Sequence, residues 1–279
     1  FDFNIASADQ NAQQTAAGPV LNRAESQSDR VYLPTGRMPQ STMIGTTGYY
    51  AGTTTNTHPN IPQAQTGTST IVIKRPNNTF VIIAALTTPA ANAALYDPST
   101  QTFSAQSGSS IPTTANGIGG FALKRPDGKF LVVLGNFTTN TNIYDPQTNT
   151  FTAGPALTGN AGLGASAILN NDGTYTIVHG ATAAFAGQTT SSIYDPVRNT
   201  TGTMLAGPTL TTAANCGFAA IPLKNNTYKI IPGVADGLVG ITTTMNYNPA
   251  TKQFTAGTAL TTTTVGCGAL VFQRADGFW

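Results

Sequence analysis

The chain has 279 residues, enough for one large domain or two smaller ones, and its hydrophobic content of 40% is sufficient for a packed core. Only 9% of the residues are charged, the net charge is +2, and the Lys and Arg residues are scattered rather than clustered. This pattern argues against nucleic acid as a partner. No apolar run approaches the roughly 20 residues of a membrane-spanning helix, so we expect no membrane span.

The first 45 residues contain no clear repeat, and we interpret residues 1–45 as an N-terminal arm that precedes a repeat region over 46–279. The sequence begins at Phe1 rather than Met, and it is rich in Thr and Asn and poor in charge. The start at Phe1 indicates either a removed signal peptide or a shortened chain, and the Thr- and Asn-rich, charge-poor composition favours a protein that is extracellular or on the cell surface. Residues 1–5 alternate apolar and polar side chains, which is typical of a β-strand.

One complete repeat unit can be followed from Gly117. An inner strand of small apolar residues is followed by the turn sequence Arg-Pro-Asp-Gly, in which proline and glycine favour a tight reversal. A β-branched and aromatic strand comes next, and a Tyr-Asp-Pro turn then joins two short strands. The predicted strands cover 119–124, 129–134 and 142–144, and a fourth begins at 150. Four short antiparallel strands are the content of one propeller blade.

This unit recurs along the chain. The tyrosines of the Tyr-Asp/Asn-Pro sequences are 48, 50 and 53 residues apart, at Tyr96, Tyr144, Tyr194 and Tyr247. The turn after the inner strand occurs five times, beginning near residues 74, 124, 170, 224 and 273. A constant period near 50 residues indicates a radial repeat.

The fifth unit stops at Trp279, just inside its second strand, so its remaining strands must come from elsewhere. An incomplete blade would expose strand edges, and pairing both chain ends in one blade removes them. We therefore predict an all-β, five-bladed β-propeller of four-stranded antiparallel blades, with a last blade built from both ends of the chain. The candidate residues for this strand addition, in the same subunit or in a neighbouring one, are Phe1, Phe3, Ile5, Phe278 and Trp279.

The sequences YDPSTQTF from Tyr96 and YDPQTNTF from Tyr144, the glycine-rich inner strands and the period together resemble kelch-type β-propellers over about residues 46–279. The resemblance implies a propeller fold and a ligand or protein partner that binds on a propeller face or loop. A fold alone does not say which partner is bound.

The carboxylates argue against catalysis. Six of the eleven lie in predicted turns, where an aspartate caps its own backbone: Asp97, Asp127, Asp145, Asp172, Asp195 and Asp276. The other five are Asp2, Asp9, Glu25, Asp29 and Asp236, and four of them lie in the N-terminal arm. The predicted inner strands carry none, so the converging pair of carboxylates that glycoside hydrolysis needs is not indicated.

Metal and cofactor sites are not indicated either. The chain has two histidines, His58 in a polar loop and His179 at the end of a predicted second strand, where we expect a packed residue. Copper and zinc sites generally use more imidazole or thiolate ligands than these. The glycine clusters recur from blade to blade and precede no helix, so we interpret them as packing positions rather than phosphate loops. We therefore predict no catalytic residue, no metal and no cofactor.

Cys216 and Cys267 occupy equivalent positions on the inner strands of the fourth and fifth units. Adjacent inner strands crowd toward the propeller axis, so the two residues are candidates for a disulfide, which needs Cα atoms within about 7 Å. Two unbonded, buried cysteines that fill small spaces are the alternative.

Two functions are compatible with these patterns. The first is a non-enzymatic extracellular or cell-surface protein with a structural or binding role, whose partner is itself or a surface glycan and which assembles through its N-terminal arm. The alternative is a carbohydrate-binding or carbohydrate-active propeller domain of a secreted enzyme. The candidate residues for a ligand-binding face are Arg37, Tyr49, Tyr50, His58 and Asp236.

Overall fold

The computed structural model describes residues 70–84, 93–105, 111, 119–135, 137–236 and 239–262. These residues form sixteen β-strands arranged in four sheets, and the described ranges contain no α-helix. Accordingly, no helix within them is long and apolar enough to cross a membrane.

Each sheet has four antiparallel strands that are neighbours in chain order. The first sheet comprises β1 (Thr70–Lys74), β2 (Phe80–Ala84), β3 (Ala94–Asp97) and β4 (Thr102–Ala105). The second comprises β5 (Phe121–Lys124), β6 (Phe130–Val133), β7 (Thr141–Asp145) and β8 (Thr150–Ala153). The third comprises β9 (Ser166–Leu169), β10 (Tyr175–Val178), β11 (Ser191–Tyr194) and β12 (Leu205–Ala206). The fourth comprises β13 (Ala219–Pro222), β14 (Tyr228–Ile231), β15 (Met245–Asn248) and β16 (Gln253–Ala256).

The turn between the first and second strands of each sheet, here called the first turn, is built by an Asx side chain. The Asp127 carboxylate accepts a hydrogen bond from the backbone N–H of Lys129 at 3.1 Å, and Asp172 accepts one from Thr174 at 3.2 Å. Asn77 and Asn225 make the same contact in the first and fourth sheets. These bonds confirm the predicted capping role of Asp127 and Asp172.

The turn between the third and fourth strands, here called the second turn, repeats the same device. Asp97, Asp145, Asp195 and Asn248 each accept a hydrogen bond from the backbone N–H two residues later, at 2.8–2.9 Å. The Tyr-Asp/Asn-Pro sequences are therefore local turn signals, and the tyrosine of each is the last or second-to-last residue of the third strand.

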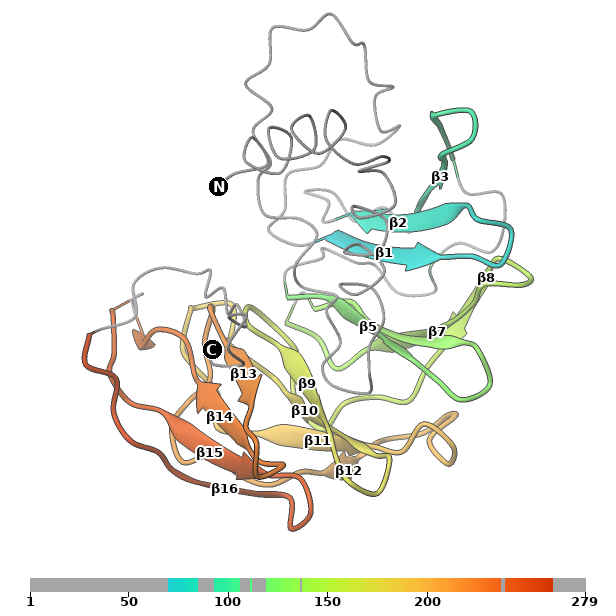
Figure 1. The fold of residues 1–279 in the computed structure, drawn as a ribbon. Coiled ribbons are helices and arrows are strands. Elements are labelled where there is room, and N and C mark those ends of the chain that lie inside the picture. Colours follow the sequence, from blue (N-terminus) through green and yellow to red (C-terminus); the bar gives the residue numbers. More distant parts are fainter. Residues whose placement is uncertain are drawn as a thin grey trace, which may run out of the picture.

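The sheets follow one another in chain order along an arc, from β1 to β16 (Figure 1). Their faces pack in consecutive pairs, which produces three buried apolar clusters rather than one. In β6, Leu131 and Val133 pack toward the third sheet, whereas Val132 packs toward the first. Because successive side chains of a strand point to opposite faces, the apolar run of β6 is buried on both sides.

The inner segments of neighbouring sheets approach each other through their backbones. Gly164 has a φ of +75°, and a Cβ atom at this position would lie 2.0 Å from the carbonyl oxygen of Asn215. Only glycine fits both the conformation and the space. Gly128 in a first turn has a similar φ of +81°, but a Cβ there would meet no atom within 4 Å.

The predicted all-β class and the predicted four-stranded antiparallel units are therefore confirmed for the described residues. The fifth blade, the closure of the ring and the N-terminal arm of residues 1–45 involve residues outside the described ranges, and they stay predictions.

Alanine substitutions at Gly128 and Gly164 distinguish the cost of a left-handed backbone conformation from the cost of a steric clash. We expect Gly128→Ala to lower the free energy of unfolding by about 1–2 kcal/mol, the cost of a left-handed conformation. Gly164→Ala should cost about 1–3 kcal/mol more, because the Asn215 backbone must also move. Urea denaturation of both variants measures the difference, and equal losses would contradict the close backbone approach.

Candidate functional site: polar contacts within and between the sheets

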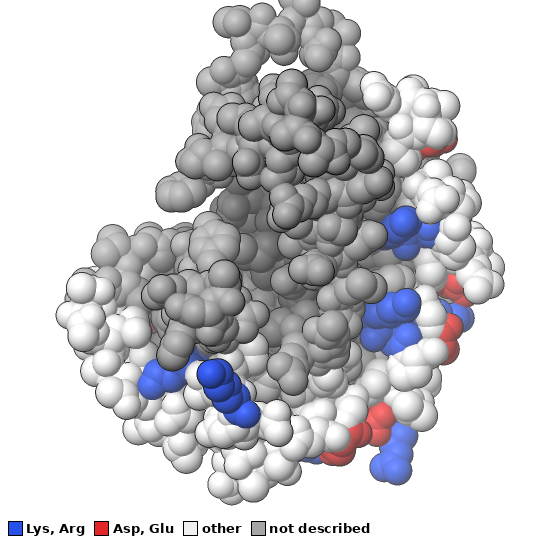
Figure 2. All heavy atoms as spheres, in the orientation of Figure 1, with Lys and Arg blue, Asp and Glu red and all other residues white. Residues whose placement is uncertain are grey.

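The charged side chains of the described residues stabilise local structure. Six carboxylates lie in these ranges, and each accepts a hydrogen bond from a backbone N–H: Asp97, Asp127, Asp145, Asp172, Asp195 and Asp236. In the face shown in Figure 2, the acidic and basic residues lie in small separate groups rather than in a broad patch of one sign. These carboxylates therefore act as turn and loop caps.

Asp236 is the one predicted ligand-face residue that the structure describes. It is exposed and accepts a hydrogen bond from the Gly187 N–H at 2.7 Å, so it links two loops that follow the second strands of the third and fourth sheets. The other ligand-face candidates, Arg37, Tyr49, Tyr50 and His58, lie outside the described residues.

Of the remaining predicted site residues, Cys216 is described and is buried, with 1% of its surface exposed. Cys267 and the strand-addition candidates Phe1, Phe3, Ile5, Phe278 and Trp279 lie outside the described ranges.

A set of tyrosine contacts between sheets was not predicted from the sequence. Arg125, in the first turn of the second sheet, is 6% exposed and donates a hydrogen bond to the hydroxyl of Tyr194 in the third sheet at 2.9 Å. The same guanidinium makes an ion pair with Asp127 at 3.1 Å. Tyr194 is fully buried, and this burial raises its pKa to about 12. The arginine supplies the partner that a buried hydroxyl requires.

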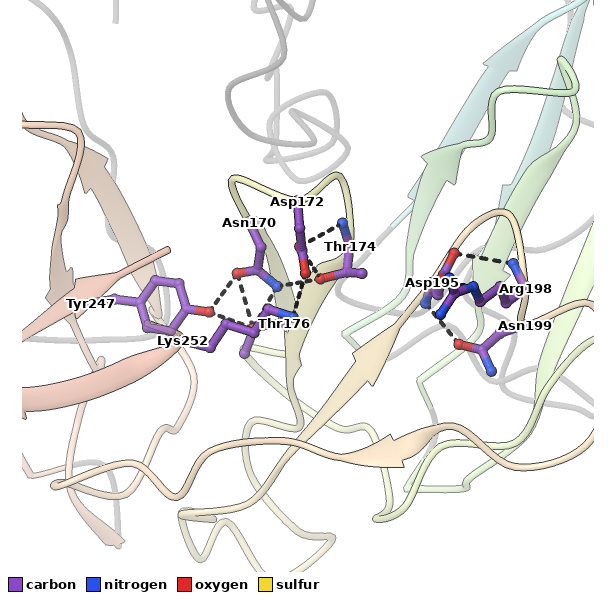
Figure 3. A network of polar contacts seen from close by, with 9 residues as sticks. All are labelled: Asn170, Asp172, Thr174, Thr176, Asp195, Arg198, Asn199, Tyr247 and Lys252. Atoms are coloured by element: carbon purple, nitrogen blue, oxygen red, sulfur yellow. Dashed lines mark hydrogen bonds and ion pairs between the residues drawn. The ribbon is translucent and has the colours of Figure 1, made fainter. Parts of the chain in front are cut away.

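The contact recurs between the third and fourth sheets (Figure 3). The hydroxyl of Tyr247 donates to the Asn170 side-chain oxygen at 2.5 Å and lies 2.6 Å from the Thr176 hydroxyl. Beside it, Lys252 of the fourth sheet makes an ion pair with Asp172 of the third at 2.6 Å. The hydrogen bond from Lys252 lowers the pKa of Asp172 to about 2.

Between the first and second sheets, Arg75 lies at the equivalent place. Its Nε donates to the Pro146 carbonyl at 3.2 Å, next to the buried Tyr144. Burial raises the pKa of Tyr144 to about 12, and the Arg75 charge opposes this rise. In all three cases the tyrosine before a second turn lies against the first turn of the preceding sheet. The sequence feature that could have indicated this arrangement is the regular spacing of both turns.

His179 is the other buried polar centre. It is fully buried at the end of β10, where Nδ1 lies 2.8 Å from the Thr190 hydroxyl and Nε2 lies 2.8 Å from the Ser192 hydroxyl. Ser192 lies in turn 2.8 Å from the hydroxyl of Thr158. Burial lowers the pKa of His179 to about 4, so the imidazole is neutral near pH 7. The predicted packing role of His179 is confirmed.

One pocket lies between the first turns of the third and fourth sheets, with a volume of about 270 Å³. Its lining combines polar residues and Tyr228 with leucine and proline: Leu169, Asn170, Asn171, Pro222, Leu223, Asn226, Thr227, Tyr228 and Pro249. Asp236, the ligand-face candidate that the structure describes, does not line it.

No protein-family model and no curated protein matches this chain. Among solved structures, the chain is similar to a fungal alcohol oxidase of the AA5 family in complex with copper. The TM-score is 0.53 and the sequence identity is 14%. The match covers 70% of this chain but only 44% of the oxidase, so the chain spans less than half of that protein. A similarity at this identity shows a shared fold and nothing about chemistry.

The described residues do not fit a copper site. They contain no group of three His, Cys, Asp or Glu side chains that could hold a metal ion. Within them the one imidazole is that of His179, and both of its nitrogens lie at hydrogen-bonding distance from hydroxyls. We derive no reaction step through copper.

His179 makes stability dependent on pH. In the unfolded chain its pKa is near 6.5, whereas in the folded chain it is about 4, so between these values the unfolded state binds more protons. The stabilisation is complete above pH 6.5 and is lost as the pH falls toward 4, by about 3 kcal/mol between pH 7 and pH 4.

In the variant His179→Gln, residue 179 does not titrate, so the free energy of unfolding should lack this loss between pH 7 and pH 4. Urea denaturation of both proteins from pH 7 to pH 4 measures it. Parallel pH profiles for the two proteins would show that His179 is not buried in its neutral form.

Proposed function

We propose that this chain is a non-enzymatic extracellular or cell-surface protein with a structural or binding role, built on a kelch-like, five-bladed β-propeller. The non-enzymatic role is supported by the hydrogen bonds that the described carboxylates and the described histidine make. Each of the six described carboxylates caps a backbone amide, and the described histidine is buried between hydroxyls. A general acid or base needs a titratable group directed at a substrate.

The five-bladed propeller is supported by the packing of the four described sheets. Each consecutive pair shares one apolar cluster, so the sheets stack as blades do. A fifth first-turn sequence, Arg274-Ala275-Asp276-Gly277, follows the fourth sheet in the chain. We propose that residues from both chain ends complete this fifth blade.

The proposed partner is a second copy of the chain or a surface glycan. Phe1, Phe3 and Ile5 alternate with polar residues, and an arm of this kind pairs with a sheet edge through its backbone. If the arm pairs with its neighbour, repetition of a head-to-tail contact produces a fibre or a ring.

The alternative is a carbohydrate-binding or carbohydrate-active domain of a secreted enzyme. The pocket between the third and fourth sheets favours this alternative, because amide and hydroxyl groups line it. A glycan array with the intact protein tests it, using Asn226→Ala as the pocket variant and Asn77→Ala, in the first turn of the first sheet, as the control. Binding that is lost only in Asn226→Ala would favour the alternative.

Deletion of residues 1–10 tests the role of the arm. If the arm assembles neighbouring subunits, the truncated chain should keep its melting temperature but appear as monomers in mass photometry. If the arm completes its own fifth blade, the melting temperature should fall sharply at an unchanged oligomeric state. A truncated protein with neither change would overturn the proposed role of the arm.

The proposed disulfide between Cys216 and Cys267 is tested by mass spectrometry of peptides from the unreduced protein. We expect a linked peptide pair, because equivalent positions on adjacent inner strands bring the cysteines close together. The bond would close a long loop and stabilise the fold by roughly 4 kcal/mol in the loop-entropy description. Two unmodified thiols in freshly isolated protein would contradict the bond.

A further inference from the structure

The connection between the second and third strands is longer in the third and fourth sheets than in the second. It covers residues 134–140 in the second sheet, 179–190 in the third and 232–244 in the fourth. Insertions of this kind lie on one face of a repeat fold, which is often the face that binds a partner. The end of the sheets that carries these connections is here called the loop end, and the opposite end, with the first and second turns, is called the turn end.

Phe185 lies in the inserted loop of the third sheet. It is 43% exposed and has a φ of +58°, a left-handed conformation that is rare for a bulky side chain. Its N–H donates to the Thr182 carbonyl at 2.9 Å, and its carbonyl accepts a hydrogen bond from the buried Asn215 side chain at 2.8 Å. The surrounding structure thus maintains an unfavourable backbone conformation that exposes an aromatic ring, and such a conformation indicates a function for the ring.

The neighbouring loop of the fourth sheet adds to this surface. Asp236 of that loop is exposed and accepts the hydrogen bond from Gly187, two residues after Phe185. Val239 of the same loop is 60% exposed. Residues 180–190 and 232–244 contain one charged residue, which is Asp236. The loop end of the third and fourth sheets therefore presents an aromatic and an aliphatic side chain together with one carboxylate.

The pocket of about 270 Å³ lies at the turn end of the same two sheets. Leu169 at the end of β9 and Pro249 in the second turn of the fourth sheet line it. Leu223 contributes a partly exposed apolar wall, and the exposed Lys224 follows it in the chain. An apolar cavity of about 150 Å³ holds a benzene ring, so this pocket has room for the side chain of a phenylalanine.

The exposed ring and the pocket lie at opposite ends of the same strands, because β10 begins after the first turn and ends before the loop of Phe185. They meet when the loop end of one molecule faces the turn end of another. Their charges are then complementary, since Asp236 lies on one side and Lys224 on the other. A contact between two different surfaces leaves each molecule with one unused ring or pocket, so repetition extends the assembly.

We propose that the Phe185 ring inserts into the pocket of a second copy of this chain, and that Asp236 pairs with Lys224 of that copy. The ring packs against Leu223 of the second copy and loses its exposed surface. A few aromatic or arginine anchors carry most of the binding energy of a typical interface. This inference rests on the proposed self-association and identifies a contact for it that is separate from the N-terminal arm.

Photo-crosslinking of the full chain with Phe185→p-benzoylphenylalanine tests the contact first. We expect a covalent dimer on a denaturing gel, linked through the peptide that contains residues 222–228. Leu205→p-benzoylphenylalanine is the matched control, since Leu205 is 69% exposed on the edge strand β12. The control should give no link to residues 222–228. A crosslink from position 185 to another segment, or none under conditions where the unmodified chain assembles, would overturn the proposal.

A mixing experiment tests that two different surfaces meet. Leu223→Glu removes the apolar wall of the pocket and places a carboxylate opposite Asp236, so the photo-reactive chain with this second substitution should lose the crosslink by roughly tenfold or more. Addition of an isotopically labelled Phe185→Asn chain, which lacks the ring but keeps the pocket, should restore it between unlike chains only. Asparagine is chosen because it tolerates the left-handed conformation. Crosslinks between two Leu223→Glu chains at the original yield would contradict the contact.

The outcomes separate this contact from the proposed function. Assembly of the unmodified chain without the crosslink rejects the contact alone, whereas monomers at every concentration reject self-association and the contact with it. A glycan whose binding depends on Asn226, in the absence of any crosslink, assigns the pocket to the alternative function and overturns the contact. If Leu223→Glu does not fold, Leu223→Gln replaces it in the mixing experiment, with the same criterion.

Discussion

The structure depends on the burial of sheet faces against neighbouring sheets, on both sides in the second and third sheets. Leu131 and Val132 are successive residues of β6, yet each is fully buried, one toward the third sheet and one toward the first. An isolated four-stranded sheet of this kind would leave the apolar side chains of both faces in water. Its stability therefore comes from stacking, in which removal of apolar surface from water provides the main favourable free energy.

Stacking also explains where the few polar groups of the core lie. A tyrosine hydroxyl that is buried between two sheets loses its hydration, and this loss is unfavourable unless a protein group replaces the water. Arg125 replaces it for Tyr194, and Asn170 with Thr176 replaces it for Tyr247. Because each bond joins two sheets, it also fixes how far one sheet can slide along the next. Directional contacts of this kind complement apolar packing, which is not directional.

The few carboxylates in the described residues have a structural role. The carboxylates in the described residues cap turns and loops, and several pair with nearby Lys or Arg side chains as well. These exposed pairs contribute little individually to stability. Their value lies in fixing the turns that set the strand register.

The fold is shared with a copper-containing alcohol oxidase of 14% identity, yet the described residues place no metal-ligand cluster on it.

The sequence by itself was sufficient for the strands, both kinds of turn and the four-stranded repeat. These features are local: Asp127 bonds an amide two residues away, and alternation along β6 can be read within one strand. Among the predicted ligand-face residues, Asp236 alone lies in the described ranges, and its bond to Gly187 could not be foreseen because 49 residues separate them.

Only the tertiary structure decided the partners of the buried Tyr194 and Tyr247. Tyr194 and Arg125 are 69 residues apart, and Tyr247 and Asn170 are 77 apart. Such pairs depend on which faces of which sheets meet. Pattern reasoning treats each repeat unit separately, whereas the hydroxyls of Tyr194 and Tyr247 find their partners in the preceding sheet, which removes them from water.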